Sequence, residues 1–337
     1  TRLIGIFRLP ESCRVLLWTL AVAWLALLPV TQAKATPFSF ALMGDQPYNN
    51  LLETATDSLI QHMNQDTNVH WILHVGDIKG GGEPCTDELL ARRIEQLQRS
   101  ERPLLFVPGD NEWTDCHRDS NGSFDSQERL AHLRKLAFAQ STSLGKQNFP
   151  VRQQTSAPFP EHLMWHQGST LFISLNIPGS NNDLDHPSSR KTSKAEVQRL
   201  FKEREKAINA WLSEAEKAFG TGQGSPTETV IAIQGNPIDG SGGMFNNGYK
   251  NFMNRLVKYI NQTKRPVLLI HGDTHRFKWD RPSLKKFGGS SETDALFYRL
   301  EGWGHPFVNS WVKVTVTPGT DKPFQVNSIA QTTQPNN

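Results

Sequence analysis

The sequence has few cysteines, no internal repeat and almost no charge imbalance, and each absence narrows the possible classes of protein. Three cysteines in 337 residues are too few for a disulfide-rich scaffold. No segment of about 20 to 50 residues recurs, which argues against a solenoid or a propeller. The first 35 residues hold four of the 36 basic and one of the 33 acidic residues, so the remainder carries 32 of each. This balanced remainder lacks the basic excess typical of nucleic-acid-binding proteins, and we expect no nucleic-acid partner.

Long apolar runs are also absent, except near the beginning of the chain. Residues 1–14 are basic, residues 15–30 are apolar and uncharged, and Ala33-Lys34-Ala35 follows them. This order is typical of a secretory signal peptide. We therefore predict a signal peptide over residues 1–35 and an exported protein, periplasmic or secreted, with no membrane attachment after cleavage. The alternative is an uncleaved membrane anchor, because the uncharged run approaches the length that spans a bilayer. Pro29 and the Ala-x-Ala site favour cleavage.

From residue 36 onward, short apolar runs alternate with amphipathic segments. The runs predict strands at 37–43, 71–75, 103–107, 163–165, 171–177, 229–233, 266–270, 296–300 and 311–317. Helical spacing of apolar residues predicts helices at 50–63, 86–97, 127–139, 194–219 and 252–260. Strands alternating with helices are typical of α/β folds, and the strand-rich ends of the two halves favour mixed sheets. We predict one α/β domain over residues 36–330, followed by a polar tail over residues 331–337.

The cysteine positions agree with an exported protein. Cys13 lies in the predicted signal peptide, which leaves Cys85 and Cys116 as a pair. In an oxidising compartment such a pair is more often bridged than free. The bridge would stabilise the fold by about 3 kcal/mol, because it closes a loop of the unfolded chain. The alternative is two buried, unpaired thiols, and the location of both residues in loops argues against it.

Four predicted strands end in the same dipeptide, glycine followed by aspartate. The pairs are Gly44-Asp45, Gly76-Asp77, Gly109-Asp110 and Gly272-Asp273. Ligands of open α/β sheets bind at the carboxyl ends of strands, and glycine lets the backbone turn sharply there. Any one pair is explained equally well by a plain turn. Together the pairs predict four carboxylates at one edge of the sheet.

Four neighbouring carboxylates repel each other unless cations neutralise them or their pKa values rise. Two divalent metal ions about 3.5–4 Å apart, bridged by one aspartate, are the simplest solution. His275 follows Asp273 by two residues and adds a nitrogen ligand. The pattern therefore predicts a dinuclear metal site. His74 and His271 precede two of the Gly-Asp pairs, and we expect them to be hydrogen-bonded core residues.

In order and strand context these motifs resemble those of the calcineurin-like metallophosphoesterases, which are Asp-x-His, Gly-Asp, Gly-Asn-His, a lone His and Gly-His-x-His. The corresponding segments are Gly44-Asp45-Gln46-Pro47, Gly76-Asp77, Gly109-Asp110-Asn111-Glu112, Gln234-Gly235-Asn236-Pro237 and Gly272-Asp273-Thr274-His275. The resemblance implies a four-layer α/β sandwich, in which two mixed β-sheets pack face to face between helices. It also implies Asp45, Asp77 and His275 as ligands of one ion, and Asp77, Asp110, Asp273 and Gln234 as ligands of the other.

The chain departs from the family pattern at several histidines. Asp273 replaces one metal ligand, and Asn111 stands at the place of the histidine that protonates the leaving group. Carboxylate and amide oxygens favour Mn²⁺, Mg²⁺ or Ca²⁺ over iron or zinc. Asn111 cannot act as a general acid, so the nearby His117 and Arg118 are candidates for proton donation and phosphate binding. The alternative for both is a structural role in their loop.

Two functions of different classes are consistent with this sequence. We predict an exported, metal-dependent phosphoesterase in which a metal-activated hydroxide attacks a small-molecule phosphoester. By loop placement alone, Tyr48, Lys79 and Asn182 would also line its cleft. The alternative is a catalytically inactive relative that binds a phosphate ligand, a metal ion or a protein partner, which the lost histidines favour. A membrane-tethered structural protein is a third possibility and requires an uncleaved leader. Four retained carboxylates favour the enzyme, because unpaired they would destabilise the fold.

Overall fold

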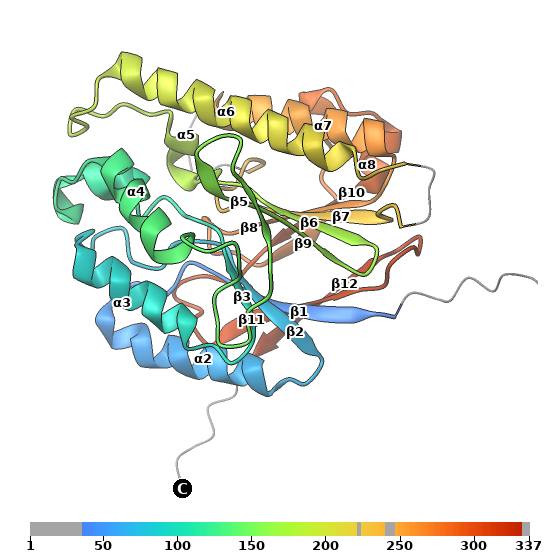
Figure 1. Cartoon of the computed structure of the whole chain (residues 1–337), viewed down its shortest axis with the longest axis horizontal. Helices are drawn as coiled ribbons and strands as arrows, with labels where there is room; N and C mark the ends of the chain where they lie inside the picture. The colour runs from blue at the N-terminus through green and yellow to red at the C-terminus, as the bar shows by residue number, and fades with distance from the viewer. Residues whose placement is uncertain (1–35, 221–223, 240–246, 332–337) are drawn as a thin grey trace, which may run out of the picture. The chain divides into compact units, whose positions relative to one another are not determined.

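The fold is built around two mixed β-sheets, as a computed structural model that describes residues 36–220, 224–239 and 247–331 shows (Figure 1). The predicted signal peptide, and the predicted tail apart from Gln331, lie outside the described residues. The first sheet has the order β12-β11-β1-β2-β3. Its strands are β1 (Phe38–Met43), β2 (Val69–His74), β3 (Leu104–Phe106), β11 (Ser310–Val316) and β12 (Phe324–Ala330). The first three are mutually parallel, so their carboxyl ends lie at one edge of the sheet.

The second sheet has the order β4-β5-β6-β7-β8-β10-β9. Its strands are β4 (Arg152–Gln154), β5 (Phe159–Gln167), β6 (Thr170–Ser174), β7 (Glu228–Ala232), β8 (Val267–His271), β9 (Lys278–Asp280) and β10 (Phe297–Glu301). β5 and β6 form the hairpin that the sequence predicts. β6, β7, β8 and β10 are parallel to one another. The carboxyl ends of these four strands therefore also lie at one edge of their sheet.

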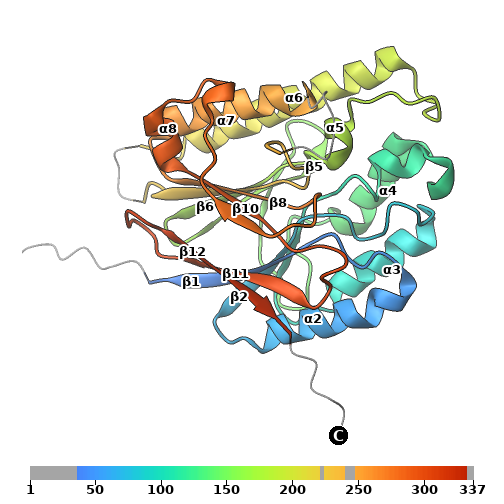
Figure 2. The ribbon, with the colours of Figure 1, turned by 180° about the vertical axis from the view of Figure 1, so that it is seen from behind.

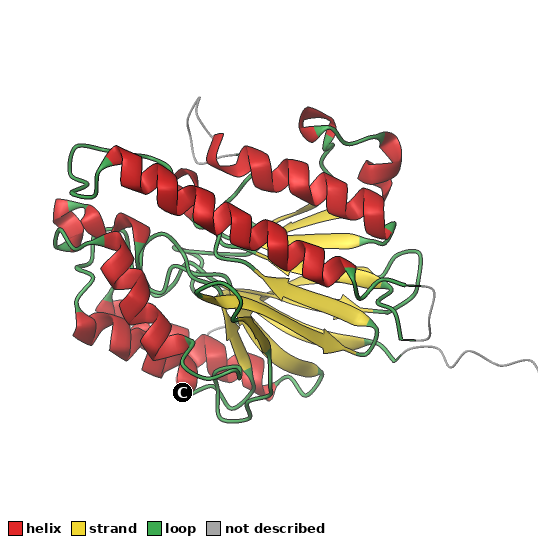
Figure 3. Ribbon diagram, turned by 45° about the horizontal axis from the view of Figure 1, so that its top comes forward, coloured by secondary structure: helices red, strands yellow, loops and turns green. Residues whose placement is uncertain are grey.

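Helices cover the outer face of each sheet, which makes four layers (Figures 1 and 3). On the side of the first sheet these are α2 (Glu53–Gln65), α3 (Asp87–Gln98) and α4 (Ser126–Ala137), and on the side of the second sheet α6 (Lys194–Glu216), α7 (Lys250–Thr263) and α8 (Ser291–Leu296). The view from behind shows β11 and β12 continuing the first sheet beyond β1 (Figure 2). The α/β sandwich with two mixed sheets is confirmed.

The core follows from the alternation of side chains along each strand. In β8, Leu268 and Ile270 belong to the core between the two sheets, whereas Val267 and Leu269 pack with α6 and α7. This period of two lets one central strand bury both of its faces. Between the sheets, Trp71 stacks on Phe40 with ring centroids 5.4 Å apart. The second sheet therefore separates two apolar clusters, one on each of its faces.

The predicted strands and long helices occur within a few residues of their expected positions. Four elements were not predicted from the sequence, namely β4, β9, β12 and α8. The first two have three residues each, and β12 is exposed at most of its positions, so its apolar pattern is weak. Within the described residues, no helix combines the length and the apolar character needed to cross a bilayer.

Candidate metal centre

The polar strand ends of both sheets meet at one place. Asp45 follows β1 and Asp77 follows β2 in the first sheet, while Asp273 and His275 follow β8 in the second. A hydrogen bond joins the sheets here, because the Asp273 backbone N–H donates to Asp45 Oδ1 at 3.0 Å. Convergence of the loops therefore follows from the shared direction of the parallel strands.

Three side chains form what we call the first cluster: Asp45, Asp77 and His275. One ligand atom of each lies within 4.8 Å of the others, a spacing that suits a single metal ion. His275 Nε2 lies 3.7 Å from Asp45 Oδ1. On the opposite side of its ring, His275 Nδ1 lies 2.8 Å from the His305 carbonyl oxygen. A carbonyl only accepts hydrogen bonds, so Nδ1 carries the proton and Nε2 presents a lone pair to the cluster.

The first cluster fits a cation because one of its oxygens has no other partner. Asp45 is completely buried, and its Oδ2 accepts no hydrogen bond from any described residue. Burial, followed by the charge of Asp273, raises the pKa of Asp45 well above its usual value. A Cβ at Gly272 would collide with this carboxylate, so only glycine leaves room for it. A buried carboxylate with an unsatisfied oxygen needs either a proton or a metal ion.

Asp77 is held from several directions. Its Oδ1 accepts from the Asn111 backbone N–H at 3.1 Å, and its Oδ2 accepts from Asn111 Nδ2 at 3.0 Å. The Tyr48 hydroxyl lies 3.1 Å from the same Oδ2. Burial and the charge of Asp110 raise the pKa of Asp77 well above its usual value. Asn111 thus orients Asp77 and, being an amide, has no proton to give to a leaving group.

The second cluster consists of Asp110, Asp273, Ser180 and Gln234. Ser180 donates to Asp110 Oδ2 at 2.7 Å, and Gln234 Nε2 donates to Asp110 Oδ1 at 3.3 Å. The backbone N–H of Asn236 donates to Asp273 Oδ2 at 3.0 Å. Burial and the charge of Asp110 raise the pKa of Asp273 to about 7. Each of these hydrogen bonds to Asp110 and Asp273 comes from a donor of the protein.

The arrangement of Gln234 differs from the one expected of a metal ligand. Its Oε1 accepts from the Gly179 backbone N–H, which leaves Nε2 facing Asp110. The N–H of Gly179 fixes this orientation, because only the amide oxygen can accept from it. In this arrangement Gln234 braces Asp110, with its amide nitrogen rather than its oxygen facing that carboxylate.

Gly179 marks the closest approach of the two second-cluster carboxylates. A Cβ at this position would lie 2.6 Å from Asp110 Oδ2 and 2.7 Å from Asp273 Oδ1. Gly179 begins α5 (Gly179–Asp183), whose residues 180–183 have φ between +47° and +58°. This is a turn of left-handed helix, which costs about 1–2 kcal/mol per residue outside glycine. Asn and Asp tolerate it best, and they occupy three of the four positions.

The same backbone conformation recurs at the metal-binding candidates. Eight of the ten non-glycine residues with positive φ in the described chain lie in the two clusters or in α5: Asp45, Asp77, Ser180, Asn181, Asn182, Asp183, Asp273 and His275. Such strain persists only where surrounding contacts impose it, and it gathers at functional sites. The strained residues therefore lie at the same edge of the sheets as the carboxylates.

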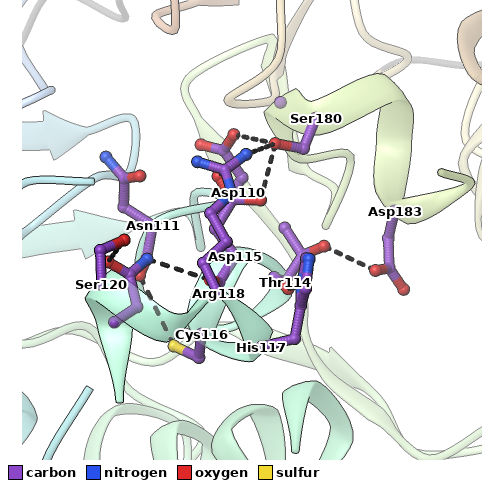
Figure 4. A network of polar contacts seen from close by, with 12 residues as sticks. Asp110, Asn111, Thr114, Asp115, Cys116, His117, Arg118, Ser120, Ser180 and Asp183 are labelled. Carbon is purple, nitrogen blue, oxygen red and sulfur yellow. Dashed lines mark hydrogen bonds and ion pairs between the residues drawn. The ribbon is translucent and has the colours of Figure 1, made fainter. Parts of the chain in front are cut away.

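A polar network extends from the second cluster into the loop after β3 (Figure 4). The Ser180 hydroxyl lies within hydrogen-bond reach of two carboxylates, at 2.7 Å from Asp110 Oδ2 and at 2.8 Å from Asp115 Oδ1. Arg118 forms an ion pair with Asp115 at 2.7 Å, and its side chain is 45% exposed. Burial, followed by the charge of Asp110, raises the pKa of Asp115 to about 8. Arg118 is therefore linked to the second cluster through Asp115 and Ser180.

His117 lies farther from the clusters than Arg118 does. Its Nδ1 lies 2.7 Å from the Thr114 carbonyl oxygen, so Nδ1 carries the proton. Burial lowers the pKa of His117. His117, Arg118 and Ser180 line one cavity of about 520 Å³, together with residues of the loop around Arg190. Among the described residues, His117 forms no hydrogen bond with a member of either cluster.

Glu112 and Lys79 support the loops from beneath. The buried Glu112 Oε1 accepts from the backbone N–H groups of Gly109 and Asp77, at 2.5 and 3.1 Å. Burial raises the pKa of Glu112 to about 7. The completely buried Lys79 donates to the carbonyl oxygen of Asn111 at 2.8 Å. Together they tie the loop after β2 to the loop after β3, and Lys79 does not line the cleft.

The predicted disulfide is confirmed. Cys85 and Cys116 are bonded, at a sequence separation of 31. Their sulfur atoms lie 3.5 and 3.6 Å from the Asn111 carbonyl oxygen. The bond therefore clamps the loop that carries Asp110 and Asn111.

The remaining polar residues have structural surroundings. His74 and His271 are fully buried and lie near backbone carbonyl oxygens, at 3.2 and 3.0 Å, as expected of core histidines. Asn182 donates to the Gly248 carbonyl oxygen and receives a bond from Arg204, so it secures α5.

The sequence did not indicate the roles of Ser180, Asp115 and Glu112. It placed Tyr48 at the cleft only through its position in a loop. Glu112 and Asp115 stand directly after the third Gly-Asp pair, and that adjacency was the available signal. For Ser180, the run Ser-Asn-Asn-Asp favours a turn, but nothing in it reveals a contact with Asp110, 70 residues away.

Comparison with known proteins identifies one family and one similar solved structure. A family model described as calcineurin-like phosphoesterase matches residues 49–277. No curated protein matches the chain. Among the matching solved structures is GAP50, described as the anchor in the inner membrane complex of Plasmodium. It is 13% identical, the match covers 88% of this chain and 90% of that chain, and the TM-score is 0.46.

Proposed function

Because this chain belongs to the calcineurin-like phosphoesterase family, we propose that it is an exported, metal-dependent phosphoesterase that acts on a small-molecule phosphoester. The observation that carries the proposal is the first cluster, where buried Asp45 presents an oxygen without a partner beside Asp77 and His275. The signal-peptide pattern and the disulfide support export.

Each of the two clusters would hold one metal ion. Asp45, Asp77 and His275 would hold the first ion, and Asp110 and Asp273 the second, with Asp77 between them. Bound ions of this kind supply an activated water and neutralise the charge that develops on phosphorus. The all-oxygen second cluster favours Mn²⁺, Mg²⁺ or Ca²⁺. Asn111 keeps Asp77 in its orientation through two hydrogen bonds.

Substrate binding and proton transfer fall to the loop after β3. Half-exposed Arg118 faces the 520 Å³ cavity and is the natural partner for a phosphate oxygen. Position 111 offers no proton donor because its side chain is an amide, and His117 holds its ring proton on the nitrogen that faces the Thr114 carbonyl oxygen. The proposal therefore favours phosphoesters with good leaving groups, such as aryl or enol esters, which need no general acid.

A non-catalytic binding protein is the second candidate, and one observation favours it. Asn111 Nδ2 donates to Asp77 at the place where the family has a proton donor. A chain that only binds an ion or a phosphate ligand would need no donor there.

The deciding experiment uses the chain from Thr36 onward, reloaded with Mn²⁺, beside Asp77→Asn. The control is Asp57→Asn, since Asp57 is half-buried and pairs with Arg99 away from the site. We expect about two ions per chain and turnover of aryl phosphate monoesters or diesters, both lost in Asp77→Asn and kept in Asp57→Asn. Bound ions without turnover of any phosphoester would favour the binding protein. The absence of specifically bound ions would exclude both metal-dependent readings.

A further inference from the structure

The cavity of about 520 Å³ that Arg118 faces adjoins the second cluster. One of its walls is the loop after β3 with His117 and Arg118, and the other is the segment from Ser180 to Arg190. Ser180 lines the cavity, and its hydroxyl lies 2.7 Å from Asp110 Oδ2 (Figure 4). The volume lies within the range of about 300–1,000 Å³ typical of small-molecule sites. The cavity is therefore positioned to receive a substrate group that extends outward from a phosphorus atom at the centre.

His117 lines this cavity and has one ring nitrogen without a partner. The side chain is 7% exposed, and its Nε2 forms no hydrogen bond with any described residue. The ring proton is on Nδ1, which faces the Thr114 carbonyl oxygen, so Nε2 carries a lone pair. Burial lowers the pKa of His117, which keeps this lone pair free of a proton at neutral pH. A buried acceptor without a partner is costly, and a ligand hydroxyl that donates its hydrogen satisfies it.

The charges of the cavity favour a neutral, hydroxylated group over a second anion. Arg118 pairs with Asp115 at 2.7 Å. The buried Arg190 pairs with Asp183 at 2.6 Å. Asp185 adds a further carboxylate to the lining. Nine of the ten residues that line the cavity have polar side chains, so the walls suit hydroxyl groups better than an aryl ring or an acyl chain.

We propose that His117 determines substrate specificity, and that the preferred substrate is a phosphodiester with a polyol or sugar as one ester group, one hydroxyl of which donates to His117 Nε2. The inference rests on the proposed phosphoesterase function and names its substrate class. Arg118 binds a phosphate oxygen, and the hydroxylated group extends past it. Such alcohols are poor leaving groups without a general acid, and position 111 supplies none. The hydroxylated group is therefore the one that stays on phosphorus, while the better leaving group departs.

The test compares two p-nitrophenyl phosphodiesters, one with glycerol and one with propanol as the second ester group. Because the leaving group is the same, a difference in kcat/KM reports on the second group alone. We expect the Mn²⁺-loaded chain from Thr36 onward to prefer the glyceryl ester by about tenfold or more, since the propyl ester leaves a buried acceptor unpaired. Equal kcat/KM values for the two esters would overturn the inference and leave the phosphoesterase proposal standing.

Two substitutions separate the binding role of His117 from its structural role. In His117→Asn the shorter amide can still donate to the Thr114 carbonyl oxygen, but it has no atom at the position of Nε2. In His117→Gln the longer amide places an oxygen near that position. We expect the preference for the glyceryl ester to disappear in His117→Asn and to be largely kept in His117→Gln.

A matched histidine control is His70→Asn, because His70 lies near the beginning of β2, at the opposite end of the strand from the centre. This variant should keep the full preference for the glyceryl ester. A preference that is unchanged in His117→Asn would overturn the inference. If His117→Asn fails to fold, the comparison of the two esters in the unsubstituted protein and in His117→Gln still decides the question.

A binding measurement separates this inference from the proposed function. Calorimetric titration of the Mn²⁺-loaded protein should show that glycerol 3-phosphate binds about tenfold more tightly than propyl phosphate, a difference that His117→Asn loses. Tightest binding of 3-aminopropyl phosphate would overturn the inference, because the ammonium group would then pair with Asp185. Preferred binding of glycerol 3-phosphate without turnover of either diester supports the role of His117 and contradicts only catalysis. Neither binding nor turnover of any of these probes would overturn both.

Discussion

The two clusters of the candidate metal centre differ in how their carboxylates are satisfied. In the first cluster, Asp45 Oδ2 is buried with no hydrogen-bond donor from the described residues. In the second, Asp110 receives bonds from Ser180 and Gln234, and Asp273 receives one from Asn236. An ion entering the first cluster satisfies an oxygen that has no partner, whereas an ion entering the second approaches carboxylates that already accept hydrogen bonds. Similar residue types therefore predict two sites of unequal affinity.

The largest effect should come from removing one carboxylate charge in each cluster. We expect Asp45→Asn to weaken the tighter Mn²⁺ site by about a hundredfold, and Asp273→Asn to weaken that site by tenfold or less while removing the weaker one. Calorimetric titration of both variants, beside Asp57→Asn, measures this difference. Equal losses of Mn²⁺ affinity in the two variants would show that the clusters act as one site and do not differ.

The disulfide offers a way to disturb the second cluster more than the first. Replacing Cys85 and Cys116 with serine should lower the free energy of unfolding by about 2–4 kcal/mol, because a 31-residue loop is no longer closed. The loop carrying Asp110 and Asn111 loses its clamp, so the weaker ion should be affected more than the tighter one. Urea unfolding followed by metal titration of the folded variant tests both parts. A larger loss at the tighter site would contradict the assignment.

A smaller effect is expected from pH on the metal-free protein. Burial raises the pKa of Glu112 to about 7, burial and Asp110 raise that of Asp273 to about 7, and Asp115 titrates near 8. Each folded pKa exceeds the unfolded value, so the folded state holds protons that the unfolded chain releases. Their contribution to stability is fully present below about pH 4 and is lost as the pH rises to about 8.

Urea midpoints at pH 5 and pH 8, with and without Mn²⁺, test this sign. Without the ion the midpoint should be lower at pH 8, and Mn²⁺ should raise it more at pH 8 because ions bind ionised carboxylates. A metal-free protein that is more stable at pH 8 than at pH 5 would show that these groups do not govern the site.

Much of the fold could be predicted because apolar runs are a local signal. Strands such as β8 are continuous apolar stretches buried on both faces, and α6 and α7 repeat their apolar residues at helical spacing. The edge strand β12 was missed because its exposed positions do not require apolar residues. Local patterns therefore identify the elements that bury surface and miss those that only complete a sheet edge.

The site was predictable only where a residue type and a strand end coincide. Each Gly-Asp pair carries both signals, so the four aspartates could be placed near one another before the structure was known. The roles of Tyr48 and Ser180 depend on contacts across 227 and 70 positions, which no local pattern records. The orientation of Gln234 depends on a single backbone N–H, that of Gly179. Such details arise from packing between loops rather than from the residues themselves.

The junction between Asp45 and Asp273 spans 228 positions of the chain, and His305 is needed to orient His275. On a ribosome adding about 5–20 residues per second, roughly 10 to 50 seconds pass between the synthesis of Asp45 and that of His305. Throughout this interval the nascent chain already carries Asp45, Asp77 and Asp110 but lacks the histidine and the second-sheet loops. Capture of an ion at the proposed centre would therefore be a late event in the synthesis of the polypeptide, and a product interrupted before residue 305 has the acidic strand ends without a complete centre.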